Sequence, residues 1–216
     1  EMQMTNEVPL ETLAYYIIRG DWPENIEVKM KDAHIMPQAY METVIKEDLS
    51  KLDDDTDYNP HKVNLLLKSL ARNETTTVSE LRLLNDIQEK DFESMSRNTI
   101  SKYLSAFNRL FLLNNQSPFS PNIRSSLRVK QSEKRHFSDP AMACAMLGIT
   151  PSKLMNDMET FGFMFEALVE HDLGIYAQSF GGKLYHYQDY KNQEIDAVIE
   201  LEDGEWCAFE IKLGAK

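Results

Sequence analysis

The sequence predicts an α+β fold, in which a helical first two-thirds is followed by a smaller α/β lobe. Apolar residues recur at helical spacing from LETLAYYIIRG (10–20) through SRNTISKYLSAFNRLFLL (96–113). The pattern then changes, and the stretch NQEIDAVIELEDGEWCAFEIK (192–212) alternates apolar and polar residues as a β-hairpin does. The switch from a helical period to a period of two predicts the fold class.

Length and composition restrict the class of protein further. The chain has 216 residues and 42% hydrophobic content, which suits one large domain or two small ones. No apolar run approaches the roughly 20 residues that span a bilayer, and no secretory signal opens the chain. We therefore expect a cytoplasmic protein without membrane contact. Cys144 and Cys207 lie in apolar stretches, so we expect both to be reduced core residues.

Residues 1–58 are predicted to form a helical connector. Its first helix stops at Gly20, and the turn-like residues GDWP follow. A second helix is expected over MPQAYMETVIKEDLSKL (36–52), and the acidic DDDTDYNP (53–60) ends it. This part of the sequence predicts helices and carries no motif with a chemical role.

Residues 59–138 are predicted to form a winged-helix-like module. Its three helices are HKVNLLLKSLAR (61–72), TVSELRLLNDI (77–87) and the helix that starts near Ser96. We expect a Thr77-x-x-Glu80 capping box on the second helix and Ser96 as the cap of the third. A basic stretch, IRSSLRVKQSEKRHF (123–137), then follows as a two-stranded ribbon. The alternative is a plain helical domain whose solvent face is basic.

The basic residues concentrate in one window of an acidic chain. Between Ser94 and His136 the net charge is +7, although the whole chain carries −12, which leaves −19 elsewhere. Such an island indicates a surface for a polyanion such as DNA, or for an acidic protein surface of its own chain or of a partner. The candidate nucleic-acid-binding residues are Arg97, Lys102, Arg109, Arg124, Arg128, Lys130, Lys134 and Arg135.

Residues 139–216 are predicted to form the α/β lobe. FGFMFEALVEHDLGIYAQSF (161–180) is apolar over most of its surface and should be a buried helix, and GGKLYHYQ (181–188) should contain a strand. In the hairpin that follows, the odd positions are apolar, so odd residues must pair with odd residues. A three-residue loop of Glu202, Asp203 and a left-handed Gly204 satisfies this, and paired residue numbers then sum to 406.

This register predicts a cluster of charges on the even face. It sets Asp196 across from Glu210, and Lys212 across from Glu194. Two carboxylates about 5 Å apart need a positive neighbour if they are covered, and Lys212 or a Mg²⁺ ion would serve. The alternative is a freely solvated face, where the repulsion is small.

Glu166 favours the metal interpretation. It is the only charged residue in FGFMFEALV, and a buried carboxylate must be paired, protonated or bound to a metal. A helix acid, then Asp, then Glu-x-Lys is the order found in Mg-dependent nuclease folds. The candidate catalytic residues are Glu166, Asp196, Glu210 and Lys212, and the first three are the candidate metal ligands. His171 and His186 lie near this region and could approach a metal, but a packed or solvated side chain is the favoured interpretation of each.

Several segments together resemble a known family. IIRGDWP, YMETVIKEDLSKL, RHFSDPAMACAMLG, FGFMFEALVEHDLGIYA and QEIDAVIELEDGEWCAFEIKLG are similar to the C-terminal domain of unknown function that follows the ATPase module in predicted prokaryotic AAA-type ATPases. The resemblance implies a winged-helix-like part and a restriction-endonuclease-like lobe, joined to an ATPase module of the same polypeptide. It also implies oligomers formed through that ATPase.

The sequence departs from the complete protein that this resemblance implies. No G-x-x-x-x-G-K-[ST] motif is present, so ATP would bind only to a module that precedes these residues, and residues 1–58 would be the connector to it. The resemblance also leaves open whether the nuclease-like lobe is truncated at its C-terminus. Two functions follow as expectations: a DNA-associated region with a Mg-dependent nuclease-like site, or a non-catalytic regulatory or protein-interaction module of the same shape.

Overall fold

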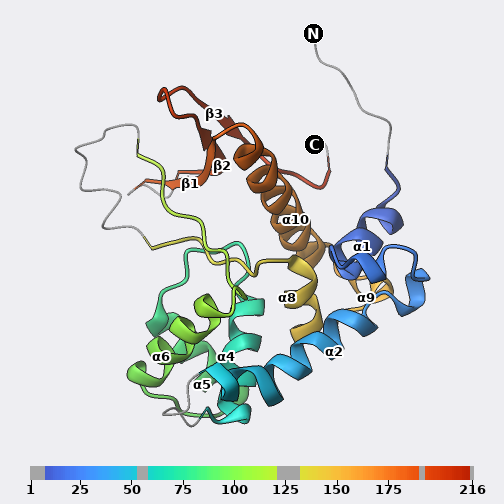
Figure 1. Ribbon diagram of the computed structural model, residues 1–216, viewed down its shortest axis with the longest axis vertical. Coiled ribbons are helices and arrows are strands. Elements are labelled where there is room, and N and C mark those ends of the chain that lie inside the picture. The colour runs from blue at the N-terminus through green and yellow to red at the C-terminus, as the bar shows by residue number, and fades with distance from the viewer. Residues whose placement is uncertain (1–7, 53–57, 121–131, 190–192, 215–216) are drawn as a thin grey trace.

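The computed structural model describes residues 8–52, 58–120, 132–189 and 193–214. It is α+β, as the sequence predicts, with a helical body at one end and a small sheet at the other (Figure 1). The long helix α10 (Met158–Ser179) connects the two ends, because it packs on α1, α8 and α9 as well as on β1 and β2. Within the described ranges, no helix is both long and apolar enough to cross a bilayer.

The N-terminal part forms the helices predicted from the apolar spacing. α1 (Leu10–Arg19) ends at Gly20, and two short 3₁₀ turns follow, η1 (Pro23–Asn25) and η2 (Met30–Asp32). α2 (Ile35–Thr43), the π-helical turn η3 (Val44–Asp48) and α3 (Leu49–Leu52) continue one another and make up the predicted second helix.

The three predicted helices of the middle part are present as α4 (Pro60–Arg72), α5 (Glu80–Asp91) and α6 (Arg97–Arg109). Ser96 caps α6 as predicted, since its Oγ accepts a hydrogen bond from the backbone N–H of Thr99 at 3.1 Å. The predicted capping box on α5 is wrong. The cap is Ser79, because α5 begins at Glu80, and Thr77 instead donates to Gln188 of β1.

Between α6 and α8 the described residues form short backbone pairings, and most of the predicted basic ribbon, residues 123–131, lies outside the described residues. Leu113 pairs with Phe137 and Gln116 with Lys134, both antiparallel, and Thr76 bridges to Arg135 on the other side. The segment 134–137 therefore lies between residue 76 and residues 113–116. This position turns Lys134 and His136 inward, where both side chains are buried.

The core of the helical body extends beyond residue 138. α8 (Pro140–Leu147) is buried on nearly all sides and packs on α1, α2 and α4, and α9 (Pro151–Met155) packs on α1. The expectation that α10 is buried all round is wrong. Phe161 and Met164 are buried, but Phe163, Ile175 and Tyr176 are exposed, because the body and the sheet cover only part of the helix circumference.

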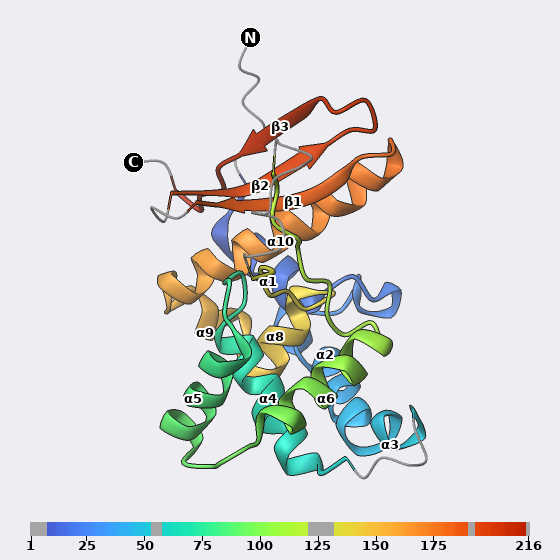
Figure 2. The ribbon, with the colours of Figure 1, turned by 90° about the vertical axis from the view of Figure 1, so that its left-hand side faces the viewer.

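The sheet has the order β1 (Lys183–Gln188), β2 (Glu194–Glu200) and β3 (Trp206–Phe209), all antiparallel, with α10 across one face (Figure 2). The predicted register is confirmed: Ala197 pairs with Phe209 and Ile199 with Cys207, so the numbers sum to 406. Gly204 in the connecting loop has a positive φ of 88°, as the three-residue loop requires.

The two cysteines differ in their surroundings. Cys144 of α8 is buried, as expected, but Cys207 of β3 is exposed, so the prediction of a second core cysteine is wrong. β3 is an edge strand, and α10 packs on β1 and β2. On the opposite face of the sheet, the ring of Phe119 packs against Tyr185 and Trp206.

Candidate functional site

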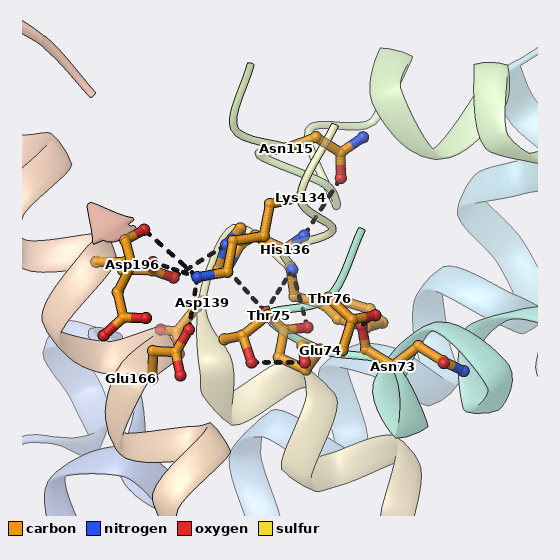
Figure 3. A network of polar contacts seen from close by, with 12 residues as sticks. Asn73, Glu74, Thr75, Thr76, Asn115, Lys134, His136, Asp139, Glu166 and Asp196 are labelled. Atoms are coloured by element: carbon orange, nitrogen blue, oxygen red, sulfur yellow. Dashed lines mark hydrogen bonds and ion pairs between the residues drawn. The ribbon is translucent and has the colours of Figure 1, made fainter. Parts of the chain in front are cut away.

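The candidate site lies where α10, β2 and the segment 134–137 meet (Figure 3). The ammonium group of Lys134 is at its centre. Its Nζ donates to Glu166 Oε1 at 2.5 Å, to Glu170 Oε1 at 2.7 Å and to the backbone carbonyl of Asp196 at 3.4 Å. The Lys134 side chain is only 8% exposed, so these contacts replace most of its hydration.

A second cation continues the cluster on the far side of Glu170. His136 Nε2 lies 3.1 Å from Glu170 Oε2, and His136 Nδ1 lies 3.2 Å from Glu74 Oε1. The Nε2–Oε2 contact has the distance of an ion pair without the geometry of a hydrogen bond. Both oxygens of Glu74 also accept from the backbone N–H of Phe137, each at 3.2 Å. We call Glu74, His136, Glu170, Lys134 and Glu166 the ion-pair network.

The network sets the protonation of its members. Burial raises the pKa of Glu166 to about 7, although the charge of Lys134 works in the opposite direction. Burial lowers the pKa of His136, but the carboxylates of Glu170 and Glu74 outweigh it and raise the value to about 9. Burial likewise opposes the charge on Lys134, and Glu170 and Glu166 together still raise its pKa. At neutral pH both cations are charged, and Glu166 keeps its proton to a higher pH than an exposed glutamate does.

The four predicted catalytic residues are only partly brought together. Glu166 and Asp196 are close enough for the charge of Asp196 to raise the pKa of Glu166. The Asp196 carboxylate, however, accepts a hydrogen bond from the backbone N–H of Ile211 at 2.7 Å. Glu210 and Lys212 form an ion pair of 2.6 Å with each other, and both side chains are more than half exposed.

The structure does not bring the three predicted metal ligands together as one group of ligands. In the described ranges, ligand atoms of Glu166, Asp196 and Glu210 do not come within 4.8 Å of one another as a group of three. Lys134 already binds the Glu166 carboxylate, and a cation needs unpaired oxygens from several carboxylates or carbonyls. Lys134 is therefore the positive charge that compensates the buried acids.

A cavity of about 240 Å³ opens beside the network. Lys134, Glu166, Asp196, His186 and the threonines at 75–77 contribute to its lining. His186 Nε2 is buried there without a hydrogen-bond partner. Burial, with the charge of Lys134 as a further cause, lowers the pKa of His186 to about 4, so this imidazole is neutral at neutral pH. The cavity is thus lined by the neutral imidazole of His186 together with the carboxylates of Glu166 on α10 and Asp196 on β2.

The predicted nucleic-acid-binding residues fall into three groups. Arg97, Lys102 and Arg109 are exposed on α6, although Arg109 also donates to the carbonyl of Leu52 at 3.2 Å. Lys134 is buried in the network, and the mostly buried Arg135 donates to the carbonyl of Val78 at 3.4 Å. Arg124, Arg128 and Lys130 lie outside the described residues.

Sequence reasoning missed three members of the network. Glu170 follows Glu166 by four residues and so shares its helix face, a signal that was present in the sequence. His136 and Glu74 left no such signal, because they lie more than 30 residues from each other and from Glu170. Only the folded chain brings them together.

Fold and site together define an α+β protein, in which buried ion pairs join the long helix α10 to the segment 134–137. The chain belongs to the family described as Domain of unknown function (DUF8612), whose model matches residues 10–153. A second model, Domain of unknown function (DUF4143), matches residues 161–216 and is commonly found after AAA ATPase modules. No curated protein and no solved structure matches the chain.

Proposed function

We propose that this chain is a non-catalytic regulatory region of an AAA-type ATPase. In this proposal residues 59–138 form a winged-helix-like module, and a nuclease-like lobe is held against it. The association of DUF4143 with AAA ATPase modules supports the ATPase partner. The order of α4, α5 and α6, followed by the paired segments 113–116 and 134–137, supports the winged-helix-like shape.

The observation that carries the proposal is the position of Lys134 Nζ between Glu166 and Glu170. A nuclease-like lobe would use the helix acid to hold a metal ion, but here a lysine from the neighbouring module neutralises it. Removing one partner from a buried ion pair typically costs about 3–5 kcal/mol, because the other charge stays buried. In this proposal Lys134 therefore takes the place of a metal ion and holds the segment 134–137 against α10.

The first test measures ATP hydrolysis by the full-length polypeptide that contains this chain. A regulatory role predicts that Glu170→Gln, which weakens the interaction with Lys134, changes the rate of ATP hydrolysis. Lys46→Gln is the matched control, since Lys46 is in an exposed ion pair with Glu42. A folded Glu170→Gln protein with the wild-type rate would contradict regulation through the network.

DNA association belongs to the same proposal and rests on α6. The exposed Arg97, Lys102 and Arg109 give this helix a cationic face. Replacing all three by Gln should weaken DNA binding and flatten its salt dependence, by a log–log slope of about 0.9 for each phosphate that the helix no longer neutralises. An unchanged salt slope, or no DNA binding by the wild-type protein, would remove nucleic acid from the proposal.

A Mg-dependent phosphodiesterase is the second candidate. It is favoured by the cavity that Glu166, Asp196 and His186 share, in which His186 Nε2 has no hydrogen-bond partner. Its test is nicking of DNA by the full-length polypeptide with Mg²⁺ or Mn²⁺, beside an Asp196→Ala variant. Cleavage by the wild-type protein alone would support it and overturn the non-catalytic proposal. Equal cleavage by both proteins, or none by either, would end this candidate.

A further inference from the structure

We infer that Asp21, His171 and Asp172 form a binding site for a first-row divalent transition-metal ion, with Zn²⁺ preferred. Asp21 follows the end of α1, and the other two residues are adjacent on α10. One imidazole nitrogen and two carboxylate oxygens lie within 4.8 Å of one another. Ligands at roughly 2.0–2.2 Å from one ion lie about 3–4.4 Å apart, so this spacing is suitable.

The imidazole nitrogen of His171 faces two carboxylates without the geometry of a hydrogen bond to either. His171 Nδ1 lies 3.4 Å from Asp172 Oδ1 and 3.7 Å from Asp21 Oδ2. The atom is buried, and it makes no hydrogen bond. A buried polar atom without a partner is uncommon and costs free energy, so it indicates a position where a ligand can bind.

The site is held in place by the backbone around it. Gly20 has a positive φ of 63°, and a Cβ there would come within 2.7 Å of Asp139 Oδ2 and 2.5 Å of the Trp22 ring. This close turn lets the backbone N–H of Asp21 donate to Asp139 Oδ2 at 2.8 Å. Asp139 is itself buried and caps α8. The backbone of Asp21 is therefore held beside α10 before any ion binds, and its side chain is 56% exposed.

The negative charge around His171 also favours the binding of a cation. Asp21, Asp139 and Asp172 surround a single imidazole, and in the described part of the chain none of the three is ion-paired with Lys or Arg. One imidazole with two carboxylates suits zinc and its neighbours, whereas Mg²⁺ and Ca²⁺ favour oxygen ligands alone. None of the three ligands belongs to the ion-pair network, so this site is independent of the proposed function.

The test is titration of the whole chain with Zn²⁺ by calorimetry, with the absorption spectrum of bound Co²⁺ as a second readout. We expect one ion per chain, and a loss of at least tenfold in affinity for Asp21→Asn and for His171→Gln. Glu27→Gln, which changes an exposed acid away from the site, should bind like the wild type.

Two results would overturn the site. One is no Zn²⁺ binding by the wild-type chain. The other is equal binding by the wild type and His171→Gln, which would place the ion elsewhere, for example on the exposed Cys207. Asp172→Asn provides a further ligand variant, since its side chain is 44% exposed and its replacement should leave the fold intact. Wild-type affinity in that variant counts against the site as well.

Discussion

Lys134 belongs to a basic stretch of the sequence, yet its side chain lies among the carboxylates of Glu166 and Glu170. The reason is physical: a buried ammonium is tolerated only when its donors are paired, and two acids one turn apart on α10 pair two of them. Glu170 matters most, because it contacts both cations of the network.

The first prediction concerns Glu170. Glu170→Gln keeps the shape of the side chain but removes the charge that Lys134 and His136 share, so the free energy of unfolding should fall by about 3 kcal/mol. Urea unfolding measures it. Glu89→Gln, at an exposed position of α5, is the control and should stay within about 0.5 kcal/mol of wild type. Equal values for the two variants would contradict a structural role of the network.

The second prediction concerns the pH dependence of Glu166. Burial raises its pKa from the ordinary 4.5 to about 7, so the folded chain holds this proton more tightly than the unfolded chain. The wild type should therefore lose stability relative to Glu166→Gln as the pH rises from about 4.5 to 7. Urea unfolding of both proteins at pH 5 and pH 7.5 measures this difference. A difference that does not change with pH would show an ordinary pKa for Glu166.

At the scale of elements, the β2–β3 hairpin follows from its own sequence. Alternation of apolar residues requires odd to pair with odd, and the three-residue loop that meets this requirement is the one observed. The register predicted that Glu210 lies beside the Asp196 carboxylate, but Glu210 forms an ion pair with Lys212. β3 ends at Phe209, and the Asp196 carboxylate binds the backbone of Ile211 instead.

The third prediction tests the loop. Gly204 has φ +88° and open space around its Cβ position, so Gly204→Ala adds backbone strain without a clash. We expect a loss of about 1 kcal/mol in the free energy of unfolding. Gly214→Ala is the control, because its Cβ also meets open space and its φ lies outside the left-handed region. Equal stability of the two variants would contradict a left-handed requirement at Gly204.

At the scale of the whole molecule, α10 links two parts that do not complete their cores alone. One face of its N-terminal half packs into the helical body, and its C-terminal half covers β1 and β2. The network adds Lys134 and His136 from the segment before α8, and Glu74 from the turn that follows α4. The second family match, 161–216, therefore excludes three residues that neutralise or position its own acids.

The fourth prediction follows from this dependence. Residues 161–214 expressed alone should not fold cooperatively, because Glu166 and Glu170 would be without both cations and Phe161 without its buried surroundings. Thermal unfolding followed by circular dichroism tests this, with the intact chain as the control. A sigmoidal transition in the isolated segment would show that it is an independent domain.

Local interactions explain why much of the fold was predictable. Helical periodicity placed α4, α5 and α6, the Ser96 cap set the start of α6, and strand alternation determined the hairpin register. These features depend on neighbours within a few residues, or on one turn of known geometry. The same reasoning failed for Cys207 and for the exposed side of α10, where burial depends on what packs from outside.

By itself, then, the sequence determined the α+β class, most helix positions, the pairing of β2 with β3 and the requirement that Glu166 be paired, protonated or bound to a metal. Only the tertiary structure decided that Glu166 is paired with Lys134, and that Glu170, His136 and Glu74 complete the network. The physical reason is that a buried charge requires compensation whatever its source. A charged residue in an apolar stretch of the sequence reveals that requirement. Which distant residue meets it depends on how the helices and strands pack.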